Sequence, residues 1–147
     1  MTELSICILT LNSVEYIRKC LKSIQQFPPD GGYEILVADN GSNDGTVTML
    51  QDEYPAVKII LNKENLGFTK PNNQMLRQAK GNFLLLLNPD TLLTEDCFNP
   101  QLDFLKANPD VGISIPKVLN ADGSFQKQSR RGEATPIEVI GYFFKLG

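Results

Sequence analysis

The chain has 147 residues and a net charge of -3, from 14 basic and 17 acidic side chains, and 41% of its residues are apolar. This length and composition suit one globular domain with its own hydrophobic core, and the lack of a long basic stripe argues against a nucleic-acid partner. The chain contains no histidine. That excludes histidine-dependent triads, histidine-based metal sites and acid–base steps by an imidazole. Any chemistry must therefore rest on carboxylates, amides, hydroxyls or a hard metal ion.

The cysteines and the apolar runs bear on location. Cys7, Cys20 and Cys97 are widely spaced and odd in number, which predicts buried free thiols instead of a zinc site or a disulfide framework. Glu3 stands where a signal peptide would carry positive charge, and no apolar run reaches the roughly 18 residues that span a bilayer. A reducing, cytoplasmic setting is expected.

Strand and helix signals alternate along the chain. Apolar runs predict strands at 4–9, 33–38, 57–61, 83–87 and 111–115. Between them, apolar residues at helical spacing predict helices beginning after Asn12, over 47–54, after Pro71 and around Leu102 and Leu105. The expected helix starts are an Asn12–Glu15 capping box, a cap at Ser42 or Asp44, and Asn99 as a cap before Pro100.

This alternation predicts an α/β fold with a mostly parallel sheet flanked by helices. In such sheets ligands bind beyond the carboxyl ends of the strands. The distinctive polar residues follow strand ends and are therefore expected along one rim that forms the pocket. They are Thr10, Asn12, Asp39, Asn62, Asn65, Asn88 and Asp90.

Several rim residues have a chemical and a structural interpretation. Asp39 could accept hydrogen bonds from a base or ribose, or it could only form its own turn. The loop after it contains Gly41, which permits close backbone approach, and Asp44, for which helix capping is the favoured role. Lys70 and Arg77 could meet phosphate or be ordinary exposed cations, whereas the amides of 72–73 are better suited to contacts than to helix formation.

Asn88-Pro89-Asp90 follows the strongest apolar run. Mg²⁺ or Mn²⁺ prefers oxygen ligands and often takes only one or two carboxylates plus substrate phosphates. Asp90 could supply that carboxylate and Asn88 a neutral oxygen, with the metal offsetting charge on a diphosphate leaving group. An Asn-Pro-Asp turn with Thr91 is the structural alternative.

Four segments together resemble family 2 glycosyltransferases of the GT-A fold. They are residues 8–12, 37–46, 65–73 and 86–90, in the family's order, and the likeness spans nearly all of residues 4–130. The resemblance implies a nucleotide-sugar-binding GT-A subdomain over 1–130. Residues 131–147 would then form an apolar C-terminal segment that leads into an acceptor-binding half missing from this chain, so that the fold is truncated at its C-terminal side.

The resemblance also implies roles for single residues. Thr10 and Asn12 look like residues that flank the base, Asp39 like the uracil- or thymine-binding aspartate, and Asn73 with the preceding loop like the pyrophosphate and sugar lining. The predicted nucleotide-sugar-binding set is Thr10, Asn12, Asp39, Gly41, Asn65, Gly67, Lys70, Asn73, Asn88 and Asp90. Asn88-Pro89-Asp90 stands in the place of the DxD metal motif, and because Asn88 replaces the first carboxylate, Asp90 is the predicted Mg²⁺ or Mn²⁺ ligand.

The activity implied is inverting transfer from a UDP- or dTDP-sugar to a saccharide or lipid-linked saccharide acceptor in cell-surface polysaccharide synthesis. Asn-Pro-Asp, residues 112–116 and residues 120–124 are similar to the rhamnosyltransferase-like branch. Lipid-linked acceptors leave room for peripheral attachment at the inner face of the membrane.

The family's catalytic base is expected beyond residue 147, since Glu95, Asp96 and Glu133 do not match its context. Nucleotide-sugar binding without efficient transfer is therefore predicted for this chain alone. One alternative is a non-enzymatic nucleotide-sugar-binding module, or one that self-associates through the apolar residues of 137–144. The other is a nucleotidyltransferase, disfavoured because no glycine-rich, basic triphosphate loop follows the first strand.

Overall fold

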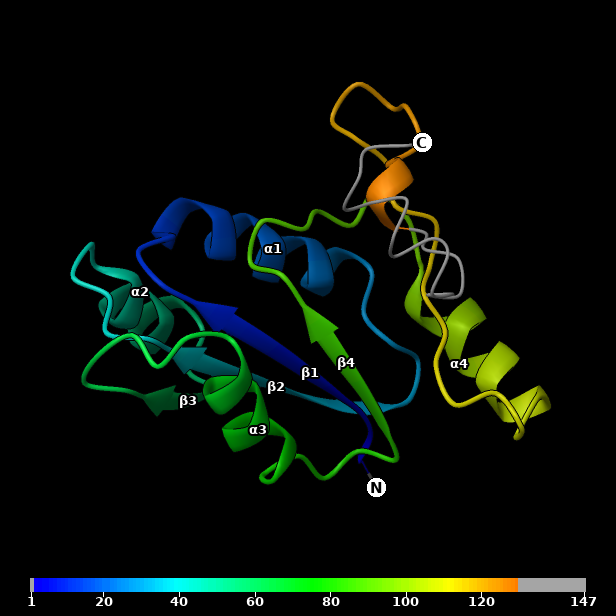
Figure 1. The fold of residues 1–147 in the computed structure, drawn as a ribbon, viewed down its shortest axis with the longest axis horizontal. Coiled ribbons are helices and arrows are strands. Elements are labelled where there is room, and N and C mark those ends of the chain that lie inside the picture. The colour runs from blue at the N-terminus through cyan, green and yellow to red at the C-terminus, as the bar shows by residue number, and fades with distance from the viewer. Residues whose placement is uncertain (1, 130–147) are drawn as a thin grey trace, which may run out of the picture. The chain divides into compact units, whose positions relative to one another are not determined.

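The computed structural model describes residues 2–129. They belong to two compact units, the first ending at Gly112 and the second beginning at Ile113. Strands and helices alternate along the first unit, as the apolar periodicity predicts (Figure 1). In chain order they are β1 (Thr2–Thr10), α1 (Val14–Gln26), β2 (Gly32–Asp39), α2 (Thr46–Glu53), β3 (Lys58–Leu61), α3 (Thr69–Leu76), β4 (Phe83–Leu87) and α4 (Phe98–Ala107), followed in the second unit by the short 3₁₀ helix η1 (Lys127–Ser129).

The four strands form one parallel sheet in the order β3-β2-β1-β4. Thr10 pairs with Asp39, and Asp39 in turn pairs with Leu61, so β1, β2 and β3 end at the same level. On the other side of β1, Ile8 pairs with Leu87 at the end of β4. The polar residues that follow the four strands therefore lie along one edge of the sheet, as expected.

Apolar side chains cover both faces of the sheet. Helices α1, α2 and α4 pack on one face around a core that includes Ile6, Ile8 and Val37. Helix α3 packs on the other face, where Met75 contacts Cys7 and Leu36. Side chains alternate between faces along a strand, so a strand covered on both sides is apolar throughout, and β1 and β2 are the most buried strands.

A polar cluster holds the connection between α3 and β4 against the opposite end of the sheet. Ser5 Oγ donates to Glu34 Oε1 at 2.7 Å and accepts from the Gly81 backbone N–H at 2.9 Å. The Lys80 backbone N–H donates to the same Glu34 oxygen at 2.6 Å. Although burial opposes ionisation of Glu34, these hydrogen bonds and the nearby Lys58 and Lys80 hold the pKa of its carboxyl below the usual value.

The fifth strand predicted at 111–115 is wrong. That segment has no ladder partner among residues 2–129, and its apolar side chains Ile113 and Ile115 are exposed. In the described part of the second unit, Leu119 and Phe125 instead form an antiparallel bridge around a turn that includes Gly123. A short apolar run favours extended backbone, but only a neighbouring strand turns that backbone into a sheet strand.

Three helix starts also differ from the prediction. Asn12 has a left-handed φ of 47° and does not form a capping box with Glu15. Helix α4 is capped by Asp96, whose Oδ1 accepts from the Phe98 and Asn99 backbone N–H groups, so Asn99 lies inside the first turn. The third helix begins at Thr69, ahead of Pro71.

In the described part of the chain, no helix combines the length and apolar character needed to cross a membrane.

Candidate functional site

Asp39, the last residue of β2, is almost fully buried, with 2% of its surface exposed. Its Oδ2 accepts from the backbone N–H groups of Gly41 at 3.0 Å and Ser42 at 2.9 Å, and its Oδ1 accepts from Ser42 Oγ. A carboxylate has room for about four hydrogen bonds. Asp39 therefore forms the turn that the structural interpretation predicts, and its Oδ1 keeps capacity for one further donor.

The loops that follow β1 and β2 are joined at this edge. Ser42 Oγ accepts from the Asn12 backbone N–H at 2.8 Å, and Asn12 Oδ1 accepts from the Asn43 backbone N–H at 2.8 Å. Thr10 Oγ1 lies 2.6 Å from Ser13 Oγ within the first loop. Asn12 thus joins the two loops and does not cap the helix. Its backbone is left-handed, a conformation that asparagine adopts more readily than most residues.

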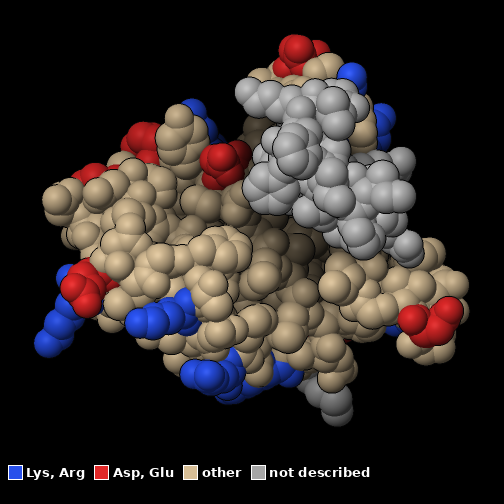
Figure 2. Space-filling model, in the orientation of Figure 1, with Lys and Arg blue, Asp and Glu red and all other residues tan. Residues whose placement is uncertain are grey.

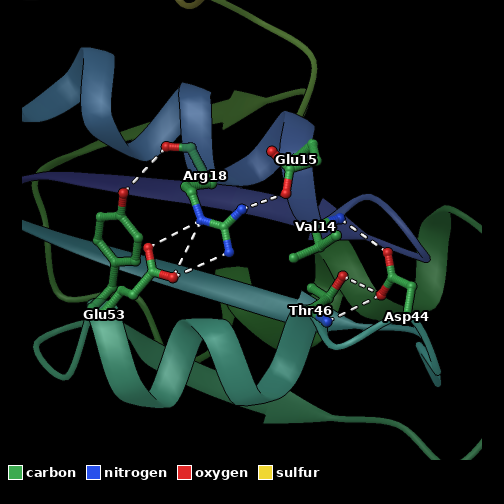
Figure 3. Close-up of polar contacts among 7 residues, drawn as sticks. Val14, Glu15, Arg18, Asp44, Thr46 and Glu53 are labelled. Carbon is green, nitrogen blue, oxygen red and sulfur yellow. Dashed lines mark hydrogen bonds and ion pairs between the residues drawn. The ribbon is translucent and has the colours of Figure 1, made fainter.

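Asp44 caps two helices at once (Figure 3). Its Oδ2 accepts from the Val14 backbone N–H, at the start of α1, at 3.0 Å. Its Oδ1 accepts from the Thr46 backbone N–H at 3.0 Å and from Thr46 Oγ1 at 2.6 Å, at the start of α2. The predicted capping role is confirmed for α2, and the cap on α1 is an addition that only the fold supplies.

Substituting Asp44 should therefore weaken two helix starts together. Partial burial opposes its ionisation, but the hydrogen bonds from Thr46 and Val14 hold the pKa of its carboxyl below the usual value. Because the folded pKa is the lower one, this stabilisation is present above the unfolded value and is lost as pH falls through the folded value. We expect Asp44→Asn to lower the free energy of unfolding at pH 7 by about 2 kcal/mol. We also expect the difference from wild type to shrink below about pH 4.

Urea unfolding at several pH values measures this difference. Asp52→Asn is the matched control, since Asp52 is an exposed carboxylate on the same helix, and it should change stability by less than about 0.5 kcal/mol. A destabilisation by Asp44→Asn that stays constant down to low pH would show that the carboxylate charge is not what caps the helices.

Arg18 ties α1 to the end of α2 that lies opposite this cap (Figure 3). Its guanidinium donates to both carboxylate oxygens of Glu53, with Nε to Oε2 at 3.0 Å, and also bonds Glu15 on its own helix. The Tyr54 hydroxyl donates to the Arg18 carbonyl at 3.2 Å. The hydrogen bonds from Arg18 to Glu53 and Glu15 raise the pKa of its guanidinium, which stays charged.

A chain of amides fastens the loop after β3. Asn40 Nδ2 donates to Asn65 Oδ1 at 3.1 Å and to the Gly67 carbonyl at 3.0 Å. Asn62 Nδ2 donates to Asn40 Oδ1 at 3.3 Å, and Gln74 Nε2 of α3 donates to Asn62 Oδ1 at 3.0 Å. Gly67 has a φ of 75°, which glycine adopts without strain. The amide chain therefore sets the path of the loop from β3 into α3.

Asn88 and Asp90 line a separate pocket of about 470 Å³ beyond the end of β4. Its other lining residues are Leu11, Ser13, Tyr16 and Pro89. The pocket is thus built between the loops that follow β4 and β1. Cys20 is buried behind it, with Sγ 3.9 Å from the Asn88 carbonyl, and burial together with the nearby Asp90 charge raises the pKa of its thiol to about 12.

Asp90 fits the predicted role of a metal ligand only in part. Among residues 2–129 no group of three or more Cys, Asp or Glu side chains converges as a metal cage would require. Asp90 and Asn88 are both exposed and offer a carboxylate and an amide oxygen. That donor set suits a Mg²⁺ or Mn²⁺ ion whose remaining ligands are phosphate oxygens and water.

The predicted lining residues on α3 divide into two groups. Asn72 is buried, and its Nδ2 donates to the Phe68 carbonyl at 2.8 Å, so it stabilises the helix start. Lys70, Asn73 and Arg77 are exposed. The role of Lys70 and Asn73 at a phosphate therefore stays a prediction.

The structure brings the predicted residues together in three clusters along one edge. Thr10, Asn12, Asp39 and Gly41 belong to the joined loops, Asn65 and Gly67 to the amide chain, and Asn88 and Asp90 to the pocket. Sequence reasoning missed the part that Ser42 plays beside Asp39 and the amide links made by Asn40, Asn62 and Gln74. Two polar residues directly after a buried strand, Asp39 and Asn40, were the available signal.

The sequence model described as "Glycosyl transferase family 2" matches residues 5–146, and the chain belongs to this family. Residues 5–146 cover both units of the chain, so the match is not confined to one motif. It confirms the family resemblance and the GT-A fold predicted from the four motifs.

Proteins similar to this chain include glycosyltransferases of bacteria and archaea. The uncharacterized glycosyltransferase YfnE of Bacillus subtilis is 39% identical over 95 residues, which are 63% of this chain and 24% of the relative. A dolichyl N-acetyl-alpha-D-glucosaminyl phosphate 3-beta-D-2,3-diacetamido-2,3-dideoxy-beta-D-glucuronosyltransferase of Methanococcus voltae is 29% identical over 153 residues, covering 95% of this chain and 44% of the relative. The chain thus spans about a quarter to under half of the length of these relatives.

Solved structures show the same fold. Staphylococcus aureus TarS 1–349 superposes with a TM-score of 0.67 at 24% identity, over 79% of this chain and 39% of TarS. The mannosyltransferase PcManGT of Pyrobaculum calidifontis, in complex with GDP-Man and Mn²⁺, has a TM-score of 0.66 at 22% identity, over 80% of this chain and 36% of that protein. These likenesses confirm the predicted α/β architecture.

Proposed function

We propose that this chain binds the nucleotide-diphosphate sugar donor of an inverting glycosyltransferase that acts on a saccharide or lipid-linked saccharide acceptor. The observation that carries the proposal is that Asp39 ends β2 and Asp90 follows β4, the two parallel strands on either side of β1, in a chain of this family. The carboxyl edge of a parallel sheet is where such folds bind nucleotides. Cell-surface polysaccharide synthesis is the setting proposed.

Within that site, Asp39 would accept a hydrogen bond from an N–H of a pyrimidine base, with UDP or dTDP as the nucleotide. The remaining capacity of Oδ1 supports this role. TarS 1–349 has been solved with UDP and with UDP-GlcNAc, whereas PcManGT holds GDP-Man. Since these neighbours bind nucleotides with different bases, an experiment must decide which nucleotide base this chain recognises.

Asp90 and Asn88 would hold Mg²⁺ or Mn²⁺ against the donor's diphosphate. A bound ion supplies positive charge that favours departure of the nucleoside diphosphate. The residues of this chain contribute oxygen ligands at the mouth of the pocket that also contains Ser13 and Tyr16. Specificity for a rhamnosyl donor, suggested by the Asn-Pro-Asp segment, belongs to the same proposal.

We infer that the isolated chain binds its donor without efficient transfer. Transfer needs a base that accepts the acceptor's proton. Asp96 is unsuited to this because both of its carboxylate oxygens are engaged at the start of α4, by Phe98 and Asn99. Glu133 lies outside the described residues. A donor-binding module that acts without transfer is the alternative function consistent with these contacts.

Thermal unfolding with UDP, dTDP or GDP, each with and without Mn²⁺, tests the proposal. A ligand at 100 times its Kd stabilises the folded state by about 2.7 kcal/mol, and about 2–4 °C of Tm corresponds to each kcal/mol in a domain of this size. We expect one pyrimidine diphosphate to raise Tm by several degrees, and Mn²⁺ to enlarge the shift. Asp90→Ala should abolish only the additional Tm shift that Mn²⁺ causes and should keep the shift caused by the nucleotide. Asp52→Ala should change neither of these two Tm shifts. No response to any nucleotide would refute the proposal.

A further inference from the structure

Positive charge is concentrated in one segment of this acidic chain. Between Lys58 and Lys80 the sequence has five cations and one carboxylate, a net charge of +4, and all five cationic side chains are exposed. The rest of the chain has nine cations and 16 carboxylates, a net charge of -7. Figure 2 shows Lys and Arg side chains gathered over the lower part of the face that carries α3.

The outer side of α3 and the chain next to it present these cations. Pro71 and Met75 are buried beneath the helix, whereas Lys70 and Arg77 are exposed and lie about two helical turns apart. Lys58 reaches the end of the same helix, where its Nζ donates to the Gln78 carbonyl at 3.5 Å.

Besides Glu64 of that segment, the carboxylate of Glu34 lies close to these cations. Lys80 lies four residues beyond the end of α3, and its backbone N–H is bonded to Glu34. Glu34 offsets part of the charge of Lys58 and Lys80, so the cations are in excess.

Two leucines lie on the same face of the sheet. Leu84 pairs with Ser5 and Leu86 pairs with Cys7, and paired residues share a face. Cys7 packs against Met75 of α3, which identifies this face as the one that α3 covers. The helix does not reach β4, and Leu84 and Leu86 remain 52% and 49% exposed.

We propose that this α3 surface, formed by Lys58, Lys70, Arg77, Lys80, Leu84 and Leu86, docks on an anionic phospholipid bilayer. Lys and Arg side chains near a membrane surface are attracted by acidic headgroups, and half-exposed leucines beside them match the apolar layer just below the headgroups. Nucleic acid would satisfy the cations but offers nothing to the leucines. Lys70 also belongs to the predicted nucleotide-sugar-binding set, so the test uses Arg77, Lys80 and Leu86, which do not belong to it.

Flotation of the whole chain with vesicles, without nucleotide, tests the surface. The probes are vesicles of phosphatidylglycerol with phosphatidylcholine, and of phosphatidylcholine alone. We expect binding only to the first, weakened by salt. Arg77→Gln/Lys80→Gln removes two cations of the surface and should weaken binding about 30-fold. Lys19→Gln/Lys22→Gln removes two exposed cations of α1, on the other side of the sheet, and should leave binding unchanged.

A second pair of measurements examines the leucines. Leu86→Gln should also weaken vesicle binding, with Tm followed to confirm folding, and light scattering should report a monomer for wild type and variant. If Arg77→Gln/Lys80→Gln and Lys19→Gln/Lys22→Gln weaken vesicle binding equally, only the net charge of the chain matters. That result would overturn the proposal that the α3 surface is the docking site. Full competition between single-stranded RNA and the vesicles would also overturn the proposal, because it would show that nucleic acid occupies this face. A dimer that Leu86→Gln dissociates would overturn it too, because a second copy of the chain would then cover the face. Absence of binding to acidic vesicles at low salt would also refute it.

Discussion

Asp39→Asn is expected to reduce strongly the stabilisation by a pyrimidine nucleotide while leaving the fold intact. An asparagine can keep its one oxygen toward the Gly41 and Ser42 backbone N–H groups, which Oδ2 now serves at 3.0 and 2.9 Å. Its amide nitrogen would then replace Oδ1, putting a donor where the base also presents a donor. Losing one such charge-assisted bond inside a buried site costs about 1–3 kcal/mol, so nucleotide affinity should fall roughly 10–100-fold.

Asp39→Ala provides the comparison for this result. It removes both the turn bonds and the base contact, so the Tm of the free protein should fall as well. Calorimetric titration with UDP and dTDP gives the affinities, and thermal unfolding without nucleotide gives the stability. If Asp39→Asn binds the nucleotide as tightly as wild type, the carboxylate serves only the turn, and the base must be recognised elsewhere along the edge.

Ser42 should show an intermediate effect in the same experiment. Its hydroxyl donates to Asp39 Oδ1 and accepts from the Asn12 backbone N–H. Ser42→Ala therefore leaves the carboxylate in place but removes one bond that orients it. A loss of nucleotide affinity close to that of Asp39→Asn would mean that orientation of the carboxylate, and not its charge, decides recognition.

Gly81→Ala is expected to destabilise the fold by about 3 kcal/mol. A Cβ at this position would lie 2.5 Å from the Ser5 nitrogen, 2.7 Å from the Leu4 carbonyl carbon and 2.9 Å from the Phe83 carbonyl oxygen. All three are backbone atoms of β1 and β4, so neither strand can move aside without disturbing the ladder between them. The Gly81 N–H would also lose its 2.9 Å bond to Ser5 Oγ.

Gly112→Ala is the matched control, because a Cβ there meets no atom within 4 Å and the backbone does not require positive φ. Urea unfolding followed by circular dichroism compares the two variants with wild type. The control should lie within about 0.5 kcal/mol of wild type. Equal stability of Gly81→Ala and wild type would contradict the close approach of the α3–β4 connection to β1.

Strand and helix order could be predicted from the sequence because it depends on short-range periodicity. The run of leucines at 83–87 and the buried run at 33–38 are strands in the structure, within a residue or two of the predicted ends. Asp39 was correctly placed at the end of its strand for the same reason. The prediction failed at 111–115, where the apolar pattern is similar but no strand of the described residues pairs with it.

The cap on α1 could not be predicted, since its acceptor comes from a distant loop. Val14 is capped by Asp44, 30 positions along the chain, and Asn12 bonds Asn43 across the same gap. A capping box assumes that the partner is three residues away. Both interactions arise only after β1 and β2 pair in parallel and bring their following loops side by side.

By itself, the sequence determined the class of fold, the family and the edge of the sheet where polar residues gather. These depend on hydrophobic periodicity and on residues that directly follow strand ends. The tertiary structure alone decided that Asp39 is already held by Ser42, that Asp44 serves two helices, and that Asn88 and Asp90 open into a pocket with Tyr16. The physical reason is that a buried polar atom takes whichever partner the fold places within hydrogen-bond distance, however far away it lies in the chain.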